Sequence, residues 1–89
     1  MRLDKFLQVT RLVKRRTLAQ DVIKAGRVQI EGRIAKPGTE LKVGDVLQVG
    51  LGRRQLTLRV LDLPERVRIG QDGLYEVLEE KVTAQEPWT

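Results

Sequence analysis

The fold is decided by residues 2–32, which read RLDKFLQVTRLVKRRTLAQDVIKAGRVQIEG. The first part of this stretch has the i, i+3, i+4, i+7 spacing of one helical face, at Leu3, Phe6, Leu7 and Thr10. In the second part, Thr17 followed by Gln20 is typical of a capping box at a helix start, and Gly26 is typical of a left-handed helix end. The stretch therefore predicts two short amphipathic helices that meet at a turn.

The second predicted helix has an apolar face and a polar face. Apolar side chains recur at helical spacing at Leu18, Ala19, Val22, Ile23 and Ala25. The outward face is expected to carry Gln20, Asp21 and Lys24. Across the whole chain, periodicity predicts core positions at Leu3, Leu7, Leu18, Val22, Val28, Ile30, Leu56, Leu58 and Val60.

After Gly26 the pattern changes to a period of two, which is typical of strands. Val28 and Ile30 alternate with polar residues, and Glu31-Gly32 is expected to form a turn. Further strands are predicted at residues 46–49, 56–60, 67–69 and 74–78. The order of elements predicts an α+β fold, in which two short N-terminal helices pack on a small, mostly antiparallel sheet.

Three segments are expected along the chain. Residues 1–63 would form the main domain, residues 64–80 a short β extension, and residues 81–89 a flexible tail. Pro64 ends the best predicted strand, and the tail combines acidic residues and proline with a lone Trp88.

The turn between the two predicted helices gathers cations, at Arg11, Lys14, Arg15 and Arg16. Adjacent like charges repel one another, so stability alone gives no reason to group them. A polyanionic partner would supply that reason, whereas a solvated basic turn is the alternative.

The rest of the charge distribution favours the polyanion. Residues 1–36 hold ten Lys or Arg against three acids, whereas residues 37–89 hold seven against nine. Net charges of +7 and −2 make up the total of +5. The first third of the chain is therefore a cationic module on a nearly neutral support, as in proteins with a one-sided nucleic-acid footprint.

Several short motifs follow one another in this sequence: Arg2-Leu-Asp-Lys-Phe-Leu7, Arg11-Leu12, Arg16-Thr17-x-Ala19, Ile23-x-x-Gly26-x-Val28-x-Ile30-x-Gly32, Lys36-Pro37 and Val43-Gly44-Asp45. In this order, over residues 2 to about 50, they resemble the S-four type RNA-binding domain, which is named after the fourth protein of the small ribosomal subunit. The resemblance implies the αL-type RNA-binding fold of that family. The short chain is also similar to its free-standing ribosome quality control members and to its 15-kDa heat-shock proteins.

The resemblance implies partners as well as a fold. Such quality control factors bind a large ribosomal subunit obstructed by peptidyl-tRNA, contact rRNA and tRNA, and support C-terminal tailing of the stalled nascent chain by a tail-adding factor. The family's RNA-facing arginines correspond to Arg2 and Arg16, with Lys5, Arg11, Lys14 and Arg15 around them. Glu31 departs from the family, in which many relatives carry asparagine at this turn, and this weakens the case for a phosphate contact at the hairpin tip.

The residues themselves also indicate how RNA would be read. Phe6, Tyr75 and Trp88 are the aromatic residues of the chain, and Phe6 is expected in the core. Readers of single-stranded bases need aromatic platforms, so we expect recognition of shape and phosphate with little sequence preference. The predicted helix start at Arg16 and Thr17 would offer backbone N–H groups to a phosphate.

Composition excludes some other functions. The chain has no cysteine and no histidine, which removes disulfides, thiolate metal sites and the commonest general base, and its carboxylates are scattered. We therefore expect a monomeric, cytoplasmic non-enzyme without cofactor, metal or membrane contact. Alternatives are a heat-shock type recycling factor for stalled large subunits, a general structured-RNA-binding module, and a DNA-binding helix-turn-helix protein.

Overall fold

The computed structural model describes residues 1–82 and contains two helices and a five-stranded sheet. The elements in chain order are α1 (Leu3–Val9), α2 (Arg16–Lys24), β1 (Val28–Ile30), β2 (Arg33–Ile34), β3 (Val46–Leu51), β4 (Arg54–Val60) and β5 (Tyr75–Val82). Every strand pairing is antiparallel, and the strand order is β2-β1-β3-β4-β5. The predicted α+β fold is confirmed.

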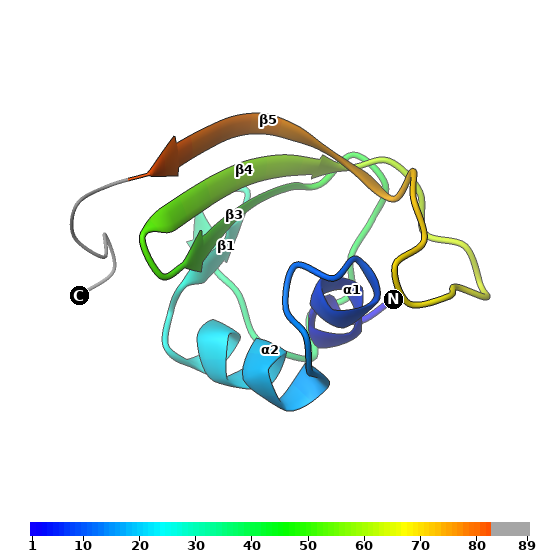
Figure 1. The fold of residues 1–89 in the computed structure, drawn as a ribbon, viewed down its shortest axis with the longest axis horizontal. Helices are drawn as coiled ribbons and strands as arrows, with labels where there is room; N and C mark the ends of the chain where they lie inside the picture. Colours follow the sequence, from blue (N-terminus) through cyan, green and yellow to red (C-terminus); the bar gives the residue numbers. More distant parts are fainter. Residues whose placement is uncertain (83–89) are drawn as a thin grey trace.

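Both helices lie on one side of the curved sheet (Figure 1), and the core fills the space between the helices and the sheet. The helices contribute Leu3, Phe6, Leu7, Ala19 and Ile23 to this core, and the sheet contributes Val28, Leu47, Val49, Leu58 and Val60. The opposite face of the sheet is free of helices in Figure 1, so the two helices of the cationic module lie on the same side of the sheet as the core.

The N-terminus is tied to the loop that follows β2. The backbone N–H groups of Leu3 and Asp4 donate to the carbonyl oxygens of Thr39 (2.9 Å) and Pro37 (3.2 Å), respectively. The terminal ammonium also pairs with Glu40 at 3.0 Å. Because the first donors of α1 are used in this way, the start of α1 is fixed in place and not open to a ligand.

The predicted turn at Glu31-Gly32 is confirmed, and the structure explains the acid in it. Glu31 and Gly32 both have positive φ, at 51° and 80°, as hairpin turns that match the twist of the strands require. The Glu31 carboxylate accepts the Val46 N–H at 3.0 Å. Its role in the structure is therefore to join the β1–β2 turn to β3.

The predicted capping box at Thr17 and Gln20 is wrong. Helix α2 begins at Arg16, its N-cap is Arg15, and the N-cap side chain makes no capping hydrogen bond. The Gln20 amide donates instead to the Asp4 carboxylate. A tertiary contact has replaced the local one, so Gln20 points toward α1 and not outward.

The predicted burial of α2 is only partly right. Ala19 and Ile23 are buried as expected, but the Leu18 residue is 47% exposed. Ala19 and Ile23 are four residues apart and lie on one face, whereas Leu18 is turned about 100° from Ala19. A narrow stripe of small and branched residues therefore faces the core, and Ala25 is exposed as well.

The C-terminal third differs most from the prediction. Residues 67–69 form part of a loop and not a strand, whereas the strand predicted at 74–78 runs from Tyr75 to Val82. It pairs with β4 through an irregularity between Thr57 and Leu58. Residues 81 and 82 thus belong to β5, and the rest of the predicted tail lies outside the described residues.

Candidate RNA-binding surface

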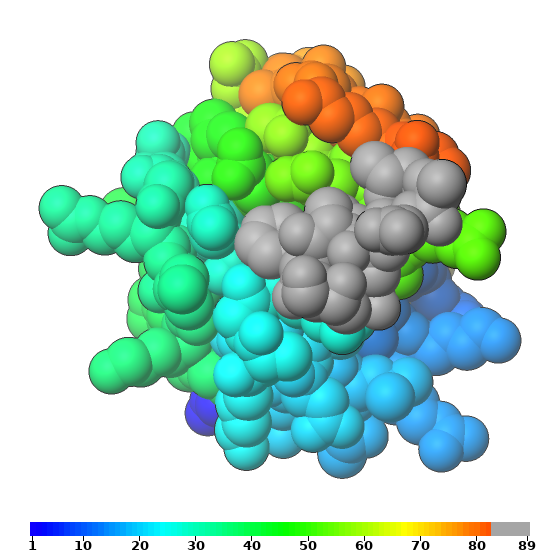
Figure 2. All heavy atoms as spheres, turned by 90° about the vertical axis from the view of Figure 1, so that its left-hand side faces the viewer, coloured from blue at the N-terminus to red at the C-terminus, as the bar shows by residue number. Residues whose placement is uncertain are grey.

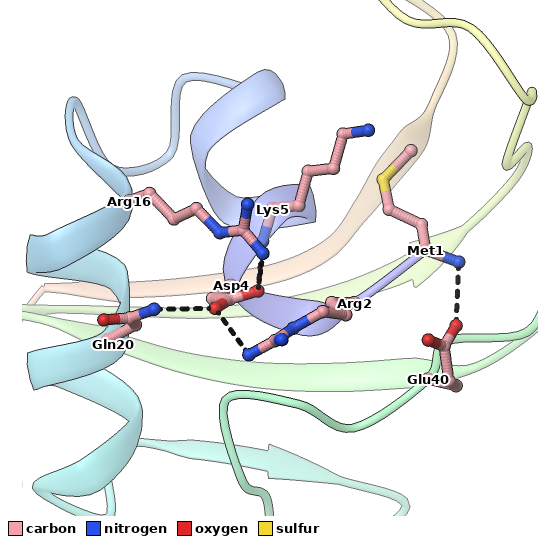
Figure 3. Close-up of polar contacts among 7 residues, drawn as sticks. All are labelled: Met1, Arg2, Asp4, Lys5, Arg16, Gln20 and Glu40. Carbon is pink, nitrogen blue, oxygen red and sulfur yellow. Dashed lines mark hydrogen bonds and ion pairs between the residues drawn. The ribbon is translucent and has the colours of Figure 1, made fainter.

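A buried carboxylate lies among the cations of the cationic module, residues 1–36. Asp4 is fully buried between α1 and α2. Its Oδ2 accepts hydrogen bonds from Arg2 Nη2 (3.2 Å) and Gln20 Nε2 (3.0 Å), and its Oδ1 accepts them from Arg16 Nη2 (3.3 Å) and the Lys5 backbone N–H (2.8 Å). Figure 3 shows the side chains of Arg16 and Gln20, from α2, and of Arg2, just before α1, converging on Asp4.

The environment of Asp4 favours its charged form. Burial by itself raises the pKa of the carboxyl group, but hydrogen bonds from Gln20, Arg16 and the Lys5 N–H, together with the Arg16 charge, outweigh that effect. The net result is a pKa below the usual value of 3.8. Asp4 is therefore ionised at neutral pH and can hold two guanidinium groups at once.

The two arginines are held but not hidden. The Arg2 side chain is 48% exposed and the Arg16 side chain 42% exposed. Because each uses one Nη atom on Asp4, other donors of both guanidinium groups remain for a ligand. The Arg2 guanidinium group lies beside Gly38, where an added Cβ would be 3.7 Å from Arg2 Nη2, an ordinary van der Waals contact.

The buried Nε of Arg16 has no hydrogen-bond partner among residues 1–82. A buried donor without a partner lowers stability. Such a cost at a cationic residue on an exposed corner is typical of a site that serves binding and not stability alone.

The other predicted site residues lie on the surface, and one of them packs against a different part of the chain. Lys5, Lys14, Arg15 and Thr17 are exposed, and Figure 3 shows Lys5 pointing away from Asp4. In Figure 2, long side chains of the segment between α1 and α2 project from the surface. The residue that packs elsewhere is Arg11, whose side chain lies beside Gly70 of the loop before β5.

Sequence reasoning missed the organising role of Asp4 and Gln20. Asp4 is fully buried, which the charge pattern of the sequence does not reveal. One signal was present: Asp4 is three residues before Leu7 and next to Leu3, so it lies at the edge of the apolar face of α1. A carboxylate there must find partners, and the nearest cations are those that bind it.

Two other kinds of site are absent from residues 1–82. None of the described helices is long and apolar enough to cross a bilayer. Nor do these residues contain a group of three or more side chains suited to hold a metal ion.

Comparison with known proteins agrees with this geometry. The sequence pattern of the S4 domain matches residues 1–47, which include α1, α2 and every predicted site residue. The chain belongs to the S4 domain family. The resemblance found in the sequence motifs is thereby confirmed.

Several relatives have names that are more specific than that of the S4 domain family. The chain is 46% identical over 82 residues to the "RQC P-site tRNA stabilizing factor" of Halalkalibacterium halodurans, covering 91% of this chain and 93% of the relative. It is 43% identical to the protein of that name from Bacillus subtilis, with 91% and 95% covered. The "Heat shock protein 15 homolog" of Aeromonas salmonicida is 38% identical, with 74% of this chain and 50% of the relative covered.

Solved structures show the same architecture. The trimeric structure of Vibrio cholerae Heat Shock Protein 15 is similar with a TM-score of 0.78 and 28% identity, over 86% of this chain and 80% of that one. The solution structure of a hypothetical protein is similar with a TM-score of 0.70 and 34% identity, over 97% of this chain and all of that one. The likeness therefore extends past residue 47 into β4 and β5.

Proposed function

We propose that this chain binds RNA through the surface organised by Asp4, and that the RNA is P-site tRNA on a large ribosomal subunit in ribosome quality control. The observation that carries the proposal is the buried Asp4 carboxylate, which holds Arg2 on one oxygen and Arg16 on the other. Two fixed guanidinium groups match phosphate oxygens without losing the side-chain entropy that free arginines would lose on binding.

The electrostatics supports a phosphate ligand. Asp4 neutralises one of the two guanidinium charges beside it, and Lys14 and Arg15 add two further cations just before α2. The first N–H groups of α2 receive no capping bond from the N-cap side chain, so they are suited to donate to a phosphate oxygen. Thr17 would contribute its hydroxyl at the same place.

The ribosomal assignment rests on the named relatives, which match more than nine-tenths of this chain. By analogy the chain would contact both rRNA and peptidyl-tRNA where the two meet at the intersubunit face, and would support addition of C-terminal tail residues by a partner factor. A recycling role of the heat-shock type is the second candidate, because a Heat Shock Protein 15 has the same fold.

Cosedimentation with purified large subunits that retain peptidyl-tRNA tests the proposal. Arg16→Ala and Arg16→Lys should both reduce the bound fraction, the lysine variant because it lacks the planar fork. Arg59→Ala is the matched control, since Arg59 is an exposed, ion-paired arginine of β4 that is 48% exposed in its side chain. Equal loss in Arg16→Ala and Arg59→Ala, with Arg16→Lys binding as well as the wild type, would reduce the effect to net charge and overturn the site.

The melting temperature must be measured alongside binding. Arg16→Ala removes one of the donors to the buried Asp4, so some loss of stability is expected. Binding is therefore compared at a temperature at which every variant is fully folded.

A further inference from the structure

A groove beside the end of α1 is not used by the surface described above. It has a volume of about 440 Å³, which falls within the range of small-molecule sites. Its walls come from the end of α1, the loop before β5 and the start of β5: Thr10, Arg11, Gly70, Gln71, Asp72, Gly73, Tyr75 and Val77. The groove is therefore lined both by the cationic module and by residues outside the S4 match.

Arg11 forms the cationic side of this groove in a strained conformation. Its φ is 62°, and within residues 1–82 the only other non-glycine residue with positive φ is Glu31. Glycine, asparagine or aspartate would adopt this conformation with less strain, so an arginine held there points to a function for its side chain. The neighbouring loop lies beside that side chain, since a Cβ added at Gly70 would be 3.8 Å from Arg11 Cγ.

The loop that closes the groove is fixed by hydrogen bonds. The Gly70 N–H donates to the Val9 carbonyl oxygen at 2.7 Å, which attaches the loop to the last turn of α1. The Arg68 N–H donates to Gln71 Oε1 at 3.1 Å, and the Gln71 N–H donates to the Arg68 carbonyl oxygen at 3.0 Å. With its oxygen engaged, the Gln71 side chain keeps its amide nitrogen as a donor, and Asp72 adds an acceptor.

The β5 side of the groove is apolar and aromatic. The Tyr75 ring packs edge-on against the buried Phe6 ring, with the ring centroids 6.4 Å apart and the planes at 68°. This contact fixes the ring at the groove. Val77 lies two residues further along the same strand and also lines the groove. This apolar residue is 49% exposed, because no described element covers it.

We propose that this groove binds one unpaired nucleotide of the RNA, with its base packed against Tyr75 and Val77 and its phosphate at Arg11. The inference rests on the proposed RNA-binding function and adds a base-stacking site to it. An aromatic ring, an apolar floor, a cation and mixed donors and acceptors are together what a splayed-out nucleotide needs. The proposal departs from the expectation of shape and phosphate recognition alone, because the position of Tyr75 beside Arg11 depends on how the loop folds.

Two hairpin RNAs that differ in one nucleotide test the groove. One is fully paired in its stem, and the other carries a single bulged 2-aminopurine, whose fluorescence falls when it stacks on an aromatic ring. The wild-type chain should bind the bulged hairpin roughly 5- to 100-fold more tightly, the gain expected from one stacked base, and should quench its fluorescence.

Matched variants separate the groove from general electrostatics. Val77→Glu places a charge in the groove and should abolish both the preference and the quenching. Leu78→Glu is the control, because Leu78 has a similar exposure of 45% on the same strand and does not line the groove. Tyr75→Phe keeps the ring and should keep the preference, whereas Tyr75→Leu should lose it.

The outcomes are distinguishable from failure of the proposed function. Equal affinity of the wild-type chain for both hairpins, or loss of the preference in Leu78→Glu as well as in Val77→Glu, would overturn the groove while leaving RNA binding intact. Absence of binding to either hairpin and to large subunits would overturn the proposed function itself.

Discussion

Replacing Asp4 by asparagine separates a preorganised arginine site from a merely basic surface. Asp4→Asn keeps the shape of the side chain but removes the charge that Arg2 and Arg16 share. Hydrogen bonds to a charged partner contribute about 1.5–3 kcal/mol each. Because both guanidinium groups are almost half exposed, solvent recovers much of that loss, and we expect a net destabilisation of about 1–3 kcal/mol. For a domain of this size that corresponds to a fall in melting temperature of about 4–20 °C.

The direction in which Asp4→Asn changes RNA affinity decides between a preorganised arginine site and a merely basic surface. Asp4→Asn makes the protein more positive, so simple electrostatics predicts tighter binding to RNA. If Asp4 holds the arginines in their binding geometry, affinity should instead fall about 3- to 10-fold, roughly the cost of ordering one or two free side chains.

Fluorescence anisotropy with a labelled structured RNA measures this difference at a temperature at which the variant is folded. Asp21→Asn provides the control, since it removes an exposed acid of α2 and should bind RNA as tightly as the wild type or slightly more so. Unchanged or tighter binding by folded Asp4→Asn would refute the preorganisation argument.

Other predictions concern pH, packing and salt. Because the pKa of Asp4 is lowered on folding, its contribution to stability is present at neutral pH and lost as the pH falls below about 4. Urea unfolding should therefore show a lower free energy of unfolding at pH 3 than at pH 7, and this difference should be smaller in Asp4→Asn than in the wild type. Leu7→Ala should lower the free energy of unfolding by about 2–5 kcal/mol, whereas Leu18→Ala should lower it by less than about 1 kcal/mol, because Leu7 is fully buried and Leu18 is 47% exposed; a large loss in Leu18→Ala would contradict the orientation of α2. The logarithm of RNA affinity should fall steeply with the logarithm of salt concentration, and Arg16→Ala should reduce that slope by about one; a salt-insensitive affinity would contradict phosphate binding.

The sequence contained most of the information about the fold because local periodicity and core packing agree. Leu3, Phe6 and Leu7 are spaced as one helical face and are fully buried, and the alternation at Leu56 and Leu58 survives in β4. Prediction failed where tertiary contacts override a local signal. Gln20 could cap its own helix, yet it satisfies a buried carboxylate from another one.

The candidate site was predicted in its cations and missed in its organisation. Exposed residues such as Lys14 and Arg15 are recognised by charge alone, which needs no three-dimensional information. The relation between Arg2 and Arg16 depends on Asp4, which is buried only because α1 and α2 pack together. The groove at Arg11 and Tyr75 depends on a loop without regular structure, so periodicity could not reveal it.

Release of the bound protein on removal of peptidyl-tRNA tests whether P-site tRNA holds the chain on the large subunit. Large subunits that carry peptidyl-tRNA are loaded with the chain, treated with puromycin or peptidyl-tRNA hydrolase, and separated on a sucrose gradient. If the chain is held jointly by rRNA and P-site tRNA, it should leave the large-subunit fraction after treatment and should bind intact ribosomes poorly. Equal binding to treated subunits, untreated subunits and whole ribosomes would contradict the assignment to P-site tRNA.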